Sequence, residues 1–227
     1  MSAARISDPI TFIRANTKIL SPPLIPEIRL HLAEESLAIW TKTEEELGAS
    51  GLPPPYWAFA WAGGQALGRY LLDHPSLVAG KPVLDLAAGC GLTAIAALKA
   101  GASRATGNDI DAFAGTAMTL NAALNGVAID VQLGDMLSGP PPAGHVILVG
   151  DLFYEKPLAE RVLAWLYLCQ KAGAVILTGD PQRTYFPQER FSRVAEYQVP
   201  VSRELEDAEI KQTSVWKLTP VSGTYGS

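Results

Sequence analysis

Residues 83–91, V-L-D-L-A-A-G-C-G, constrain the fold of this chain more than any other stretch. They begin with a short apolar run, which is typical of a buried strand in a parallel sheet. Gly89 and Gly91 follow, and residues without a Cβ allow both a tight turn and the close approach of a ligand to the backbone. Residues 92–100 are rich in alanine and leucine and stop at Gly101, as expected of a helix. A strand, a glycine turn and a helix in this order direct free N–H groups at a nucleotide-like ligand.

The same alternation of strands and helices continues along the chain. We predict strands over residues 105–109, 128–133, 146–149 and 174–178, and helices over residues 65–73, 112–125 and 157–171. Two further strands, over residues 194–201 and 214–218, flank a charged, loop-like segment at 203–212 and predict a hairpin at the sheet edge. The pattern predicts an α/β fold in which a doubly wound, mostly parallel sheet has helices on both faces.

Residues 1–55 have a different pattern. Asp8-Pro9 favours a helix over residues 9–16, a proline-broken connector follows, and a second helix is compatible with residues 26–35. Residues 41–55 are typical of an acidic helix followed by a Gly/Pro linker. Because this part is too weakly patterned for a core of its own, we expect residues 1–55 to form a helical extension. It would pack on, or cover, a single domain over residues 56–227.

Composition argues against several classes of protein. Hydrophobic residues make up 48% and charged residues 18%, which indicates a folded chain. The net charge of −5 argues against a nucleic-acid partner, and two cysteines with three scattered histidines give no metal-ligand spacing. No apolar run approaches the ~20 residues of a membrane span, and no signal-peptide pattern opens the chain. We therefore expect a cytoplasmic protein with no metal and no membrane partner.

An aspartate stands at or near the end of each of five consecutive strands. These residues are Asp85, Asp109 with Asp111, Asp135, Asp151 and Asp180. In a sheet of this kind the ligand lies beyond the carboxyl ends of the strands. Aspartate is common in loops and at helix starts, but that preference does not explain all five. The pattern predicts an acidic ligand site at this rim.

The nature of the ligand follows from the glycine turn. Gly89-x-Gly91-x-x-Ala94 matches the dinucleotide fingerprint, with Asp109 about the expected ~20 residues downstream, so a nicotinamide or flavin enzyme is one interpretation. However, Asp85 would crowd a pyrophosphate, and the turn contains no Lys or Arg. S-adenosylmethionine, which has a ribose and positive centres, fits better. Asp109 would bind its ribose, Asp135 its adenine amino group, and Asp85 would lie near its cationic groups.

Two other residues near this site have open interpretations. Trp61 belongs to the aromatic stretch 56–61, which core packing would explain, but its position just upstream of the first strand makes it a candidate wall of the cofactor pocket. Cys90, between the two glycines, is interpreted as a small residue that fills the turn rather than as a nucleophile.

At this point the chain resembles the class I, seven-β-strand methyltransferases. Their first motif, an acid ahead of a G-x-G turn, is D-L-A-A-G-C-G here, and the two C-terminal strands match the family's antiparallel seventh strand. D-L-F-Y-E at 151–155 resembles the acid-x-x-Tyr signature of a group of protein-lysine methyltransferases. L-I-P-E-I-R-L-H-L-A at 24–33 and P-Y-W-A-F-A-W-A-G-G at 55–64 are similar to one branch, the electron transfer flavoprotein β-subunit lysine methyltransferases.

This resemblance implies a function and roles for individual residues. The methyl donor would be S-adenosylmethionine, the product S-adenosylhomocysteine, and the substrate a protein lysine, that of the electron transfer flavoprotein β subunit. Asp151 would orient the amine, through its carboxylate or its backbone carbonyl, and Tyr154 would form an aromatic wall. Phe153 would contact substrate or enter the core, and Glu155 would contact substrate or cap a helix. Independently of the resemblance, Arg183 follows Asp180-Pro181 past the fifth strand, on the same rim, where it would guide substrate or belong to a turn.

Three other functions stay open at the level of sequence. The glycine motif does not separate a protein-lysine enzyme from a small-molecule N-methyltransferase of the nicotinamide type. A nicotinamide-dependent oxidoreductase and a non-catalytic binding module with the same fold are the others. The N-P-P-Y or D-P-P-Y pattern of enzymes that methylate planar nitrogens is absent, because Leu152 and Phe153 replace the prolines, and this disfavours a DNA base or a glutamine as substrate.

Overall fold

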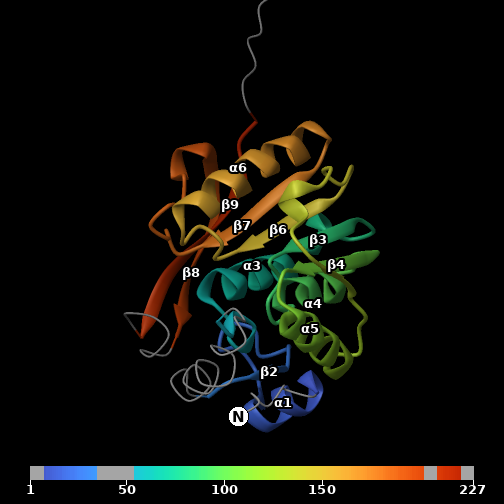
Figure 1. Ribbon diagram of the computed structural model, residues 1–227. Coiled ribbons are helices and arrows are strands. Elements are labelled where there is room, and N and C mark those ends of the chain that lie inside the picture. The colour runs from blue at the N-terminus through green and yellow to red at the C-terminus, as the bar shows by residue number, and fades with distance from the viewer. Residues whose placement is uncertain (1–7, 35–53, 202–208, 221–227) are drawn as a thin grey trace, which may run out of the picture.

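The computed structural model describes residues 8–34, 54–201 and 209–220 and is built around a seven-stranded sheet (Figure 1). The strand order is β5-β4-β3-β6-β7-β9-β8. The strands are β3 (Pro82–Leu86), β4 (Arg104–Asp109), β5 (Asp130–Leu133), β6 (Val146–Gly150), β7 (Val175–Asp180), β8 (Phe191–Pro200) and β9 (Ile210–Leu218). The strands from β5 to β7 are parallel, whereas β9 is antiparallel to both β7 and β8. The predicted fold class is confirmed.

Helices cover both faces of this sheet (Figure 1). On one face lie α3 (Ala62–Asp73), α4 (Leu92–Lys99) and α5 (Ala112–Leu124), and on the other lies α6 (Lys156–Lys171). Alternate residues of β3 serve the two layers: Val83 packs in the cluster with α3 and α4, while Leu84 and Leu86 pack with α6. Burial on both faces explains the nearly continuous apolar sequences of the central strands β3 and β6. Within the described ranges, none of the helices is long and apolar enough to cross a membrane.

The predicted elements of this core are present, with shifted boundaries. Helix α3 begins at Ala62, earlier than predicted, and β7 continues through Gly179 and Asp180. Strand β9 begins at Ile210, inside the segment predicted to be a loop, and pairs with β8 as the expected edge hairpin. The longer β7 places Asp180 inside the sheet rather than in the turn that follows.

The described part of residues 1–55 is only partly helical. Helix α1 (Pro9–Asn16) is confirmed, and its N-cap Asp8 accepts hydrogen bonds from the backbone N–H groups of Ile10 and Thr11. The prediction of a helix over residues 26–35 is wrong, because β2 (Leu30–Leu32) pairs there with β1 (Lys18–Leu20). All three residues of β2 are buried. The helix expected at 41–55 falls mostly outside the described residues.

This N-terminal part is docked on α5. The His31 N–H donates to Asn121 Oδ1 at 2.7 Å, and Asn125 exchanges two hydrogen bonds with the backbone of Arg29, at 2.6 and 3.1 Å. Phe12 packs edge-on against Phe113, with 5.5 Å between the ring centroids. These contacts fix the segment that leads into the aromatic stretch beside the glycine turn.

Candidate active site

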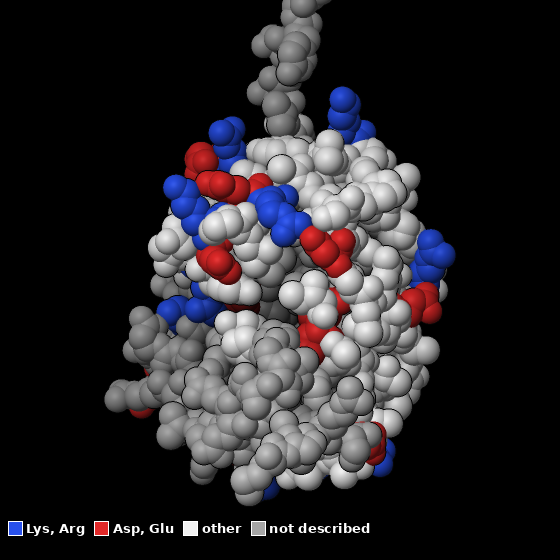
Figure 2. Space-filling model, viewed as in Figure 1, with Lys and Arg blue, Asp and Glu red and all other residues white. Residues whose placement is uncertain are grey.

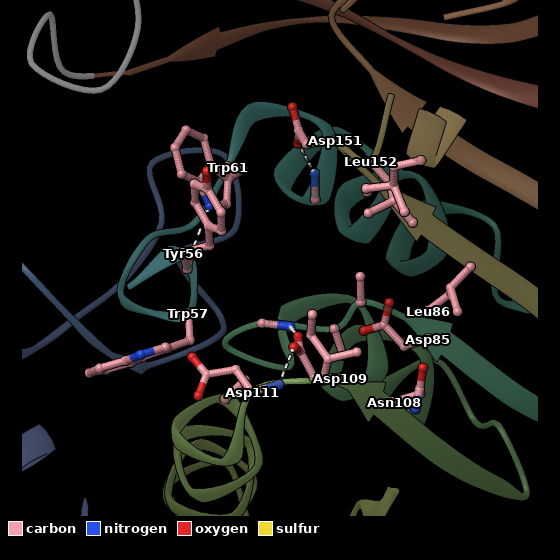
Figure 3. Close-up of a pocket in the computed structure, with 18 of the residues that line it drawn as sticks. Tyr56, Trp57, Trp61, Asp85, Leu86, Asn108, Asp109, Asp111, Asp151 and Leu152 are labelled. Carbon is pink, nitrogen blue, oxygen red and sulfur yellow. Dashed lines mark hydrogen bonds between the residues drawn. The ribbon is translucent and has the colours of Figure 1, made fainter. Parts of the chain in front are cut away.

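A cavity of about 720 Å³ opens at the carboxyl ends of β3, β4 and β6. This volume is within the usual range for small-molecule and cofactor sites. The aspartates identified at four of the five strand ends line it together with the glycine turn: Asp85, Asp109 with Asp111, Asp135 and Asp151. Figure 2 shows a hollow in this face, with acidic and basic atoms around its edge. In Figure 3, Asp85, Asp109 and Asp111 lie on one side of the cavity, and Asp151, Trp61 and Tyr56 lie on the other.

The glycine turn has the conformation that its composition predicted. Gly89 and Gly91 have φ angles of 52° and 78°, in the left-handed region that favours glycine. A Cβ on Gly91 would lie 3.0 Å from Met118 Cγ, so the turn also packs too closely on α5 for a side chain. The Gly89 N–H donates to Asp109 Oδ2 at 2.9 Å, which ties the turn to the end of β4.

Asp85 joins β3 to the start of α4. Its Oδ2 accepts hydrogen bonds from the Thr93 hydroxyl and, at 3.0 Å, from the Ala94 N–H. The side chain is 1% exposed, and burial raises its pKa to about 7. Asp85 therefore both lines the cavity and holds the helix that follows the glycine turn.

The end of β4 carries a second pair of acids. Asp109 Oδ1 accepts from the Asp111 N–H at 3.0 Å, and Asp111 caps α5 by accepting from the Phe113 N–H at 2.8 Å. Burial raises the pKa of Asp109 and raises that of Asp111 to about 6. Asn108, which the sequence analysis did not single out, donates to the carbonyls of Gln132 and Gly134 and holds the end of β5. A buried polar residue inside a strand was the signal for it.

Asp135 occupies the rim of the cavity and is already well paired. It accepts hydrogen bonds from Arg161 Nη2 at 2.5 Å, from Ser138 Oγ at 3.0 Å and from the Leu137 N–H at 3.1 Å. The Arg161 guanidinium holds the pKa of this carboxyl below its usual range. Asp135 thus lines the cavity as one half of an exposed ion pair.

Asp151, on the opposite side of the cavity, is held by hydrogen bonds from two residues. Its Oδ2 accepts from the Gly64 N–H at the start of α3, at 3.1 Å (Figure 3), and its Oδ1 accepts from Arg183 Nε at 3.1 Å and Nη2 at 2.7 Å. Asp151 has a φ of 52°, which is uncommon for a residue with a side chain. The guanidinium carbon of Arg183 also lies 5.7 Å from the centroid of the Trp61 ring.

Three aromatic residues adjoin Asp151. The ring centroid of Tyr56 lies 6.0 Å from that of Trp61 and 5.8 Å from that of Tyr154. Trp61 Nε1 donates to the Tyr56 carbonyl at 3.0 Å, which fixes the indole (Figure 3). Tyr154 lines the cavity and is 44% exposed. This end of the cavity therefore combines an anchored carboxylate with aromatic faces, the two partners that suit an amine or ammonium.

Known proteins are similar in sequence to this chain over nearly its whole length. The rat protein named electron transfer flavoprotein beta subunit lysine methyltransferase is 39% identical over 216 residues, which cover 92% of this chain and 84% of the rat protein. The human protein of that name is also 39% identical over 216 residues, covering 92% and 81% of the two chains. This chain belongs to the electron transfer flavoprotein β-subunit lysine methyltransferase family.

Two further comparisons place the family within a wider fold. Residues 67–149 match the model of the family described as ribosomal protein L11 methyltransferase (PrmA). A crystal structure of a Pyrococcus horikoshii protein, provisionally assigned as an RNA methyltransferase, has a TM-score of 0.53, covers 81% of this chain and 98% of its own, and is 15% identical. At that identity the likeness concerns the fold alone. The sequence-based assignment of a methyltransferase is confirmed.

Three of the open interpretations of this methyltransferase's residues are resolved by position. Phe153 is fully buried and packs against Phe186 and Phe191, so a substrate contact is wrong and the core alternative holds. Glu155 occupies the N-cap position of α6, but its side chain makes no capping hydrogen bond, and it lines the cavity. Cys90 is buried and its pKa is raised to about 12 by burial, which does not suit a nucleophile.

Asp180 is the strand-end acid that does not line the cavity. It is fully buried, and its Oδ1 accepts from the Arg183 N–H at 2.7 Å. Its Oδ2 has no hydrogen-bond partner among the described residues, and burial together with the nearby Asp151 raises its pKa to about 7. Asp180 anchors the backbone of Arg183 from behind the site.

Proposed function

We propose that this chain transfers methyl groups from S-adenosylmethionine to lysine side chains of the electron transfer flavoprotein β subunit. The observation that carries the proposal is the position of Asp151 and Tyr154, the ends of the acid-x-x-Tyr element. They line the same cavity as the glycine turn, in a chain 39% identical over 92% of its length to a named enzyme of this activity. We further propose that residues 1–55 form an extension and residues 56–227 the methyltransferase domain. In this proposal the protein is cytoplasmic and has neither a nucleic-acid nor a membrane partner.

The acidic side of the cavity suits the methyl donor. We assign the ribose hydroxyls to Asp109, whose oxygens each accept one N–H and, as carboxylate oxygens, have capacity for more. The rim acid Asp135 is assigned to the adenine amino group, and Asp85 to the cationic end. The glycines of the turn beside these acids leave the backbone accessible to the ligand. No Lys or Arg lies in residues 85–91, so the turn itself has no cation that would bind a phosphate.

The chemistry requires a neutral amine. When bound, S-adenosylmethionine supplies a methyl group on a positively charged sulfur. The lysine nitrogen lone pair forms the new C–N bond as the C–S bond breaks, the sulfur keeps the bonding pair, and the proton of the resulting ammonium passes to water. The protein therefore has to align the nitrogen rather than provide a nucleophile.

Asp151 and Tyr154 perform this alignment in our proposal. The Asp151 carboxylate already holds the Gly64 N–H and Arg183, so we assign its backbone carbonyl to the incoming amine. A left-handed conformation at a residue with a Cβ costs free energy, and such residues cluster at functional sites because the surrounding structure fixes them. The Tyr154 ring, which lies tilted beside that of Tyr56, supplies a face for the amine and its methylated forms.

The direct test is to follow a labelled methyl group. The chain is incubated with radiolabelled S-adenosylmethionine and a cell extract, and protein and small solutes are separated. Label in a protein that co-migrates with the electron transfer flavoprotein β subunit supports the proposal. Label confined to small solutes instead supports the nicotinamide-type alternative and contradicts it.

Calorimetry separates the remaining alternatives. We expect heat of binding with S-adenosylmethionine and none with NADH. NADH binding alone would indicate an oxidoreductase, and cofactor binding without transfer to any acceptor would indicate a non-catalytic module.

A further inference from the structure

The end of the cavity that contains Asp151, where we place the lysine amine and which we call the acceptor end, already contains a cation. Arg183 contacts the Asp151 carboxylate through two nitrogens, at 2.7 and 3.1 Å, and its guanidinium lies over the Trp61 ring. The Arg183 and Asp151 side chains are only 19% and 7% exposed, so water screens this pair weakly. The backbone of Arg183 is fixed as well, because its N–H donates to the buried Asp180. Arg183 is therefore a built-in part of the site rather than a solvated side chain.

This arrangement addresses a difficulty in the proposed function, on which the inference rests. A lysine amine has an ordinary pKa near ~10.4 and is protonated at neutral pH. A bare carboxylate beside it would stabilise the ammonium, which has no lone pair and does not accept a methyl group. Asp151 without a counter-charge would thus hold the substrate in its unreactive form.

We propose that Arg183 is a positioning residue that neutralises Asp151, so that the acceptor end of the cavity selects the unprotonated lysine amine. A cation next to a lysine amine favours its neutral form, and a low-dielectric wall strengthens that effect. Arg183 acts through Asp151 and through the field at the amine, while the orienting groups stay as assigned. The same charge disfavours the methylated ammonium product and so promotes its release.

Other titratable groups face this position and have to be separated from Arg183 in any pH experiment. Asp180 lies on β7, and burial raises its pKa to about 7. Besides Asp151 and Arg183, the titratable groups of the cavity wall are Glu155, Tyr154, Tyr56, Asp85, Cys90, Asp109, Asp111, Asp135 and Arg161. Of all these, Asp180 is bonded directly to the Arg183 backbone, and it is therefore the group to remove in a control.

The test is the pH dependence of kcat for methylation of the purified electron transfer flavoprotein β subunit. In Arg183→Gln we expect the rising limb to move about one pH unit upward, so that kcat falls about tenfold at neutral pH and returns to within about twofold of wild type on the alkaline plateau. KM for the protein substrate does not rise, because the unpaired Asp151 attracts the ammonium. Arg183→Lys, which keeps the charge, leaves the limb within about half a pH unit of wild type.

The controls isolate charge at this position. Arg183→Leu removes the charge but retains an apolar contact with Trp61, and it shifts the limb as Arg183→Gln does. Arg193→Gln removes the same charge from an exposed ion pair with Glu196 outside the cavity. The rising limb of the pH dependence of kcat does not move in this variant. In an Asp180→Asn background, the shift caused by Arg183→Gln persists. Thermal melting and S-adenosylmethionine affinity are measured for each variant to confirm that it is folded.

Several outcomes would overturn the inference while leaving the proposed function intact. One is a loss of kcat in Arg183→Gln by the same factor at every pH, which indicates a purely structural role. Another is an equal shift in Arg183→Lys, which shows that charge is not the cause. A third is disappearance of the shift in the Asp180→Asn background. If wild type itself transfers no methyl group to the β subunit, it is the proposed function that fails.

Discussion

Gly63 and Gly179 meet backbone to backbone where the start of α3 crosses the end of β7. A Cβ added to Gly63 would lie 2.2 Å from the Gly179 carbonyl oxygen and 2.4 Å from Asp151 Oδ2, and one added to Gly179 would lie 2.0 Å from the Gly63 carbonyl oxygen. No real side chain tolerates such contacts, so the crossing requires glycine at both positions. It brings the next N–H, that of Gly64, within hydrogen-bonding distance of Asp151.

This crossing predicts a large effect of a single methyl group. Gly63→Ala should lower the free energy of unfolding by about 1–3 kcal/mol, the usual cost of overpacking, and should lower methyl transfer because Asp151 is displaced. Gly64→Ala is the matched control: its Cβ would meet only Leu92 Cδ2, at 3.9 Å, so stability stays within about 1 kcal/mol of wild type. Chemical denaturation measures both. Equal stability of the two variants would refute the packing argument.

Asp109 is expected to govern affinity for the methyl donor. Asp109→Asn removes one acceptor oxygen and the charge, and we expect the Kd for S-adenosylmethionine to rise about ten- to a hundredfold, as for loss of a charged hydrogen bond. Asp130→Asn, at the exposed start of β5 and outside the cavity, is the control and leaves Kd unchanged. Isothermal titration calorimetry provides the measurement. An unaltered Kd in Asp109→Asn would remove Asp109 from the ribose site.

Substitutions of Tyr154 separate the role of its aromatic ring from that of its hydroxyl. Because Tyr154 presents an aromatic face beside Tyr56, Tyr154→Phe should retain kcat within about threefold, whereas Tyr154→Ala should lose about a hundredfold through poor alignment of the amine. Steady-state kinetics with saturating methyl donor gives both values. If the phenylalanine variant is as impaired as the alanine variant, the hydroxyl is the working group instead.

Asp180 predicts a pH-dependent loss of stability. Burial raises its pKa from an ordinary value near ~4 to about 7, so between these values the folded chain keeps a proton that the unfolded chain has released. Its contribution to stability therefore falls as pH rises through this window. In Asp180→Asn, the decrease in Tm between pH 5 and pH 8 should be smaller than in wild type.

The control for this experiment is Asp135→Asn. Arg161 holds the pKa of Asp135 below its usual range, so this acid is ionised in both folded and unfolded chains above pH 5. Its replacement leaves the pH 5 to pH 8 change in Tm as in wild type. A decrease in Asp180→Asn as large as that in wild type would show that Asp180 is not protonated in the folded state.

The core of the fold could be predicted because its signals are local. Residues 83–101 contain a strand, a glycine turn and a helix in immediate succession, and the neighbouring strands β4 and β6 each lead through an acid into a helix. The N-terminal strand β2 could not be predicted in this way. Leu30 and Leu32 are buried because they pack against the glycine turn and α4, and the hydrogen bond from His31 to Asn121 on α5 spans 90 positions.

The site was partly predictable for the same reason. The strand-end acids lie where parallel strands must bring them, and those of four of the five strands line one cavity. The bond between Arg183 and Asp151 was not predictable, because these residues are 32 positions apart and meet only through the register of β6 and β7. Likewise, the pair of Gly63 and Gly179 carries no sequence signal beyond two small residues in separate elements.

The central claim is that the Asp151 end of the cavity directs methyl transfer to a protein lysine. The most direct measurement is the intact mass and lysine-specific mass spectrum of the purified electron transfer flavoprotein β subunit after incubation with S-adenosylmethionine and either wild type or Asp151→Ala. We predict added methyl groups on lysine with wild type, and at least about a hundredfold slower addition with Asp151→Ala, whose Kd for S-adenosylmethionine stays near that of wild type. Methylation by Asp151→Ala at the wild-type rate, or no methylated lysine with wild type, would contradict the account.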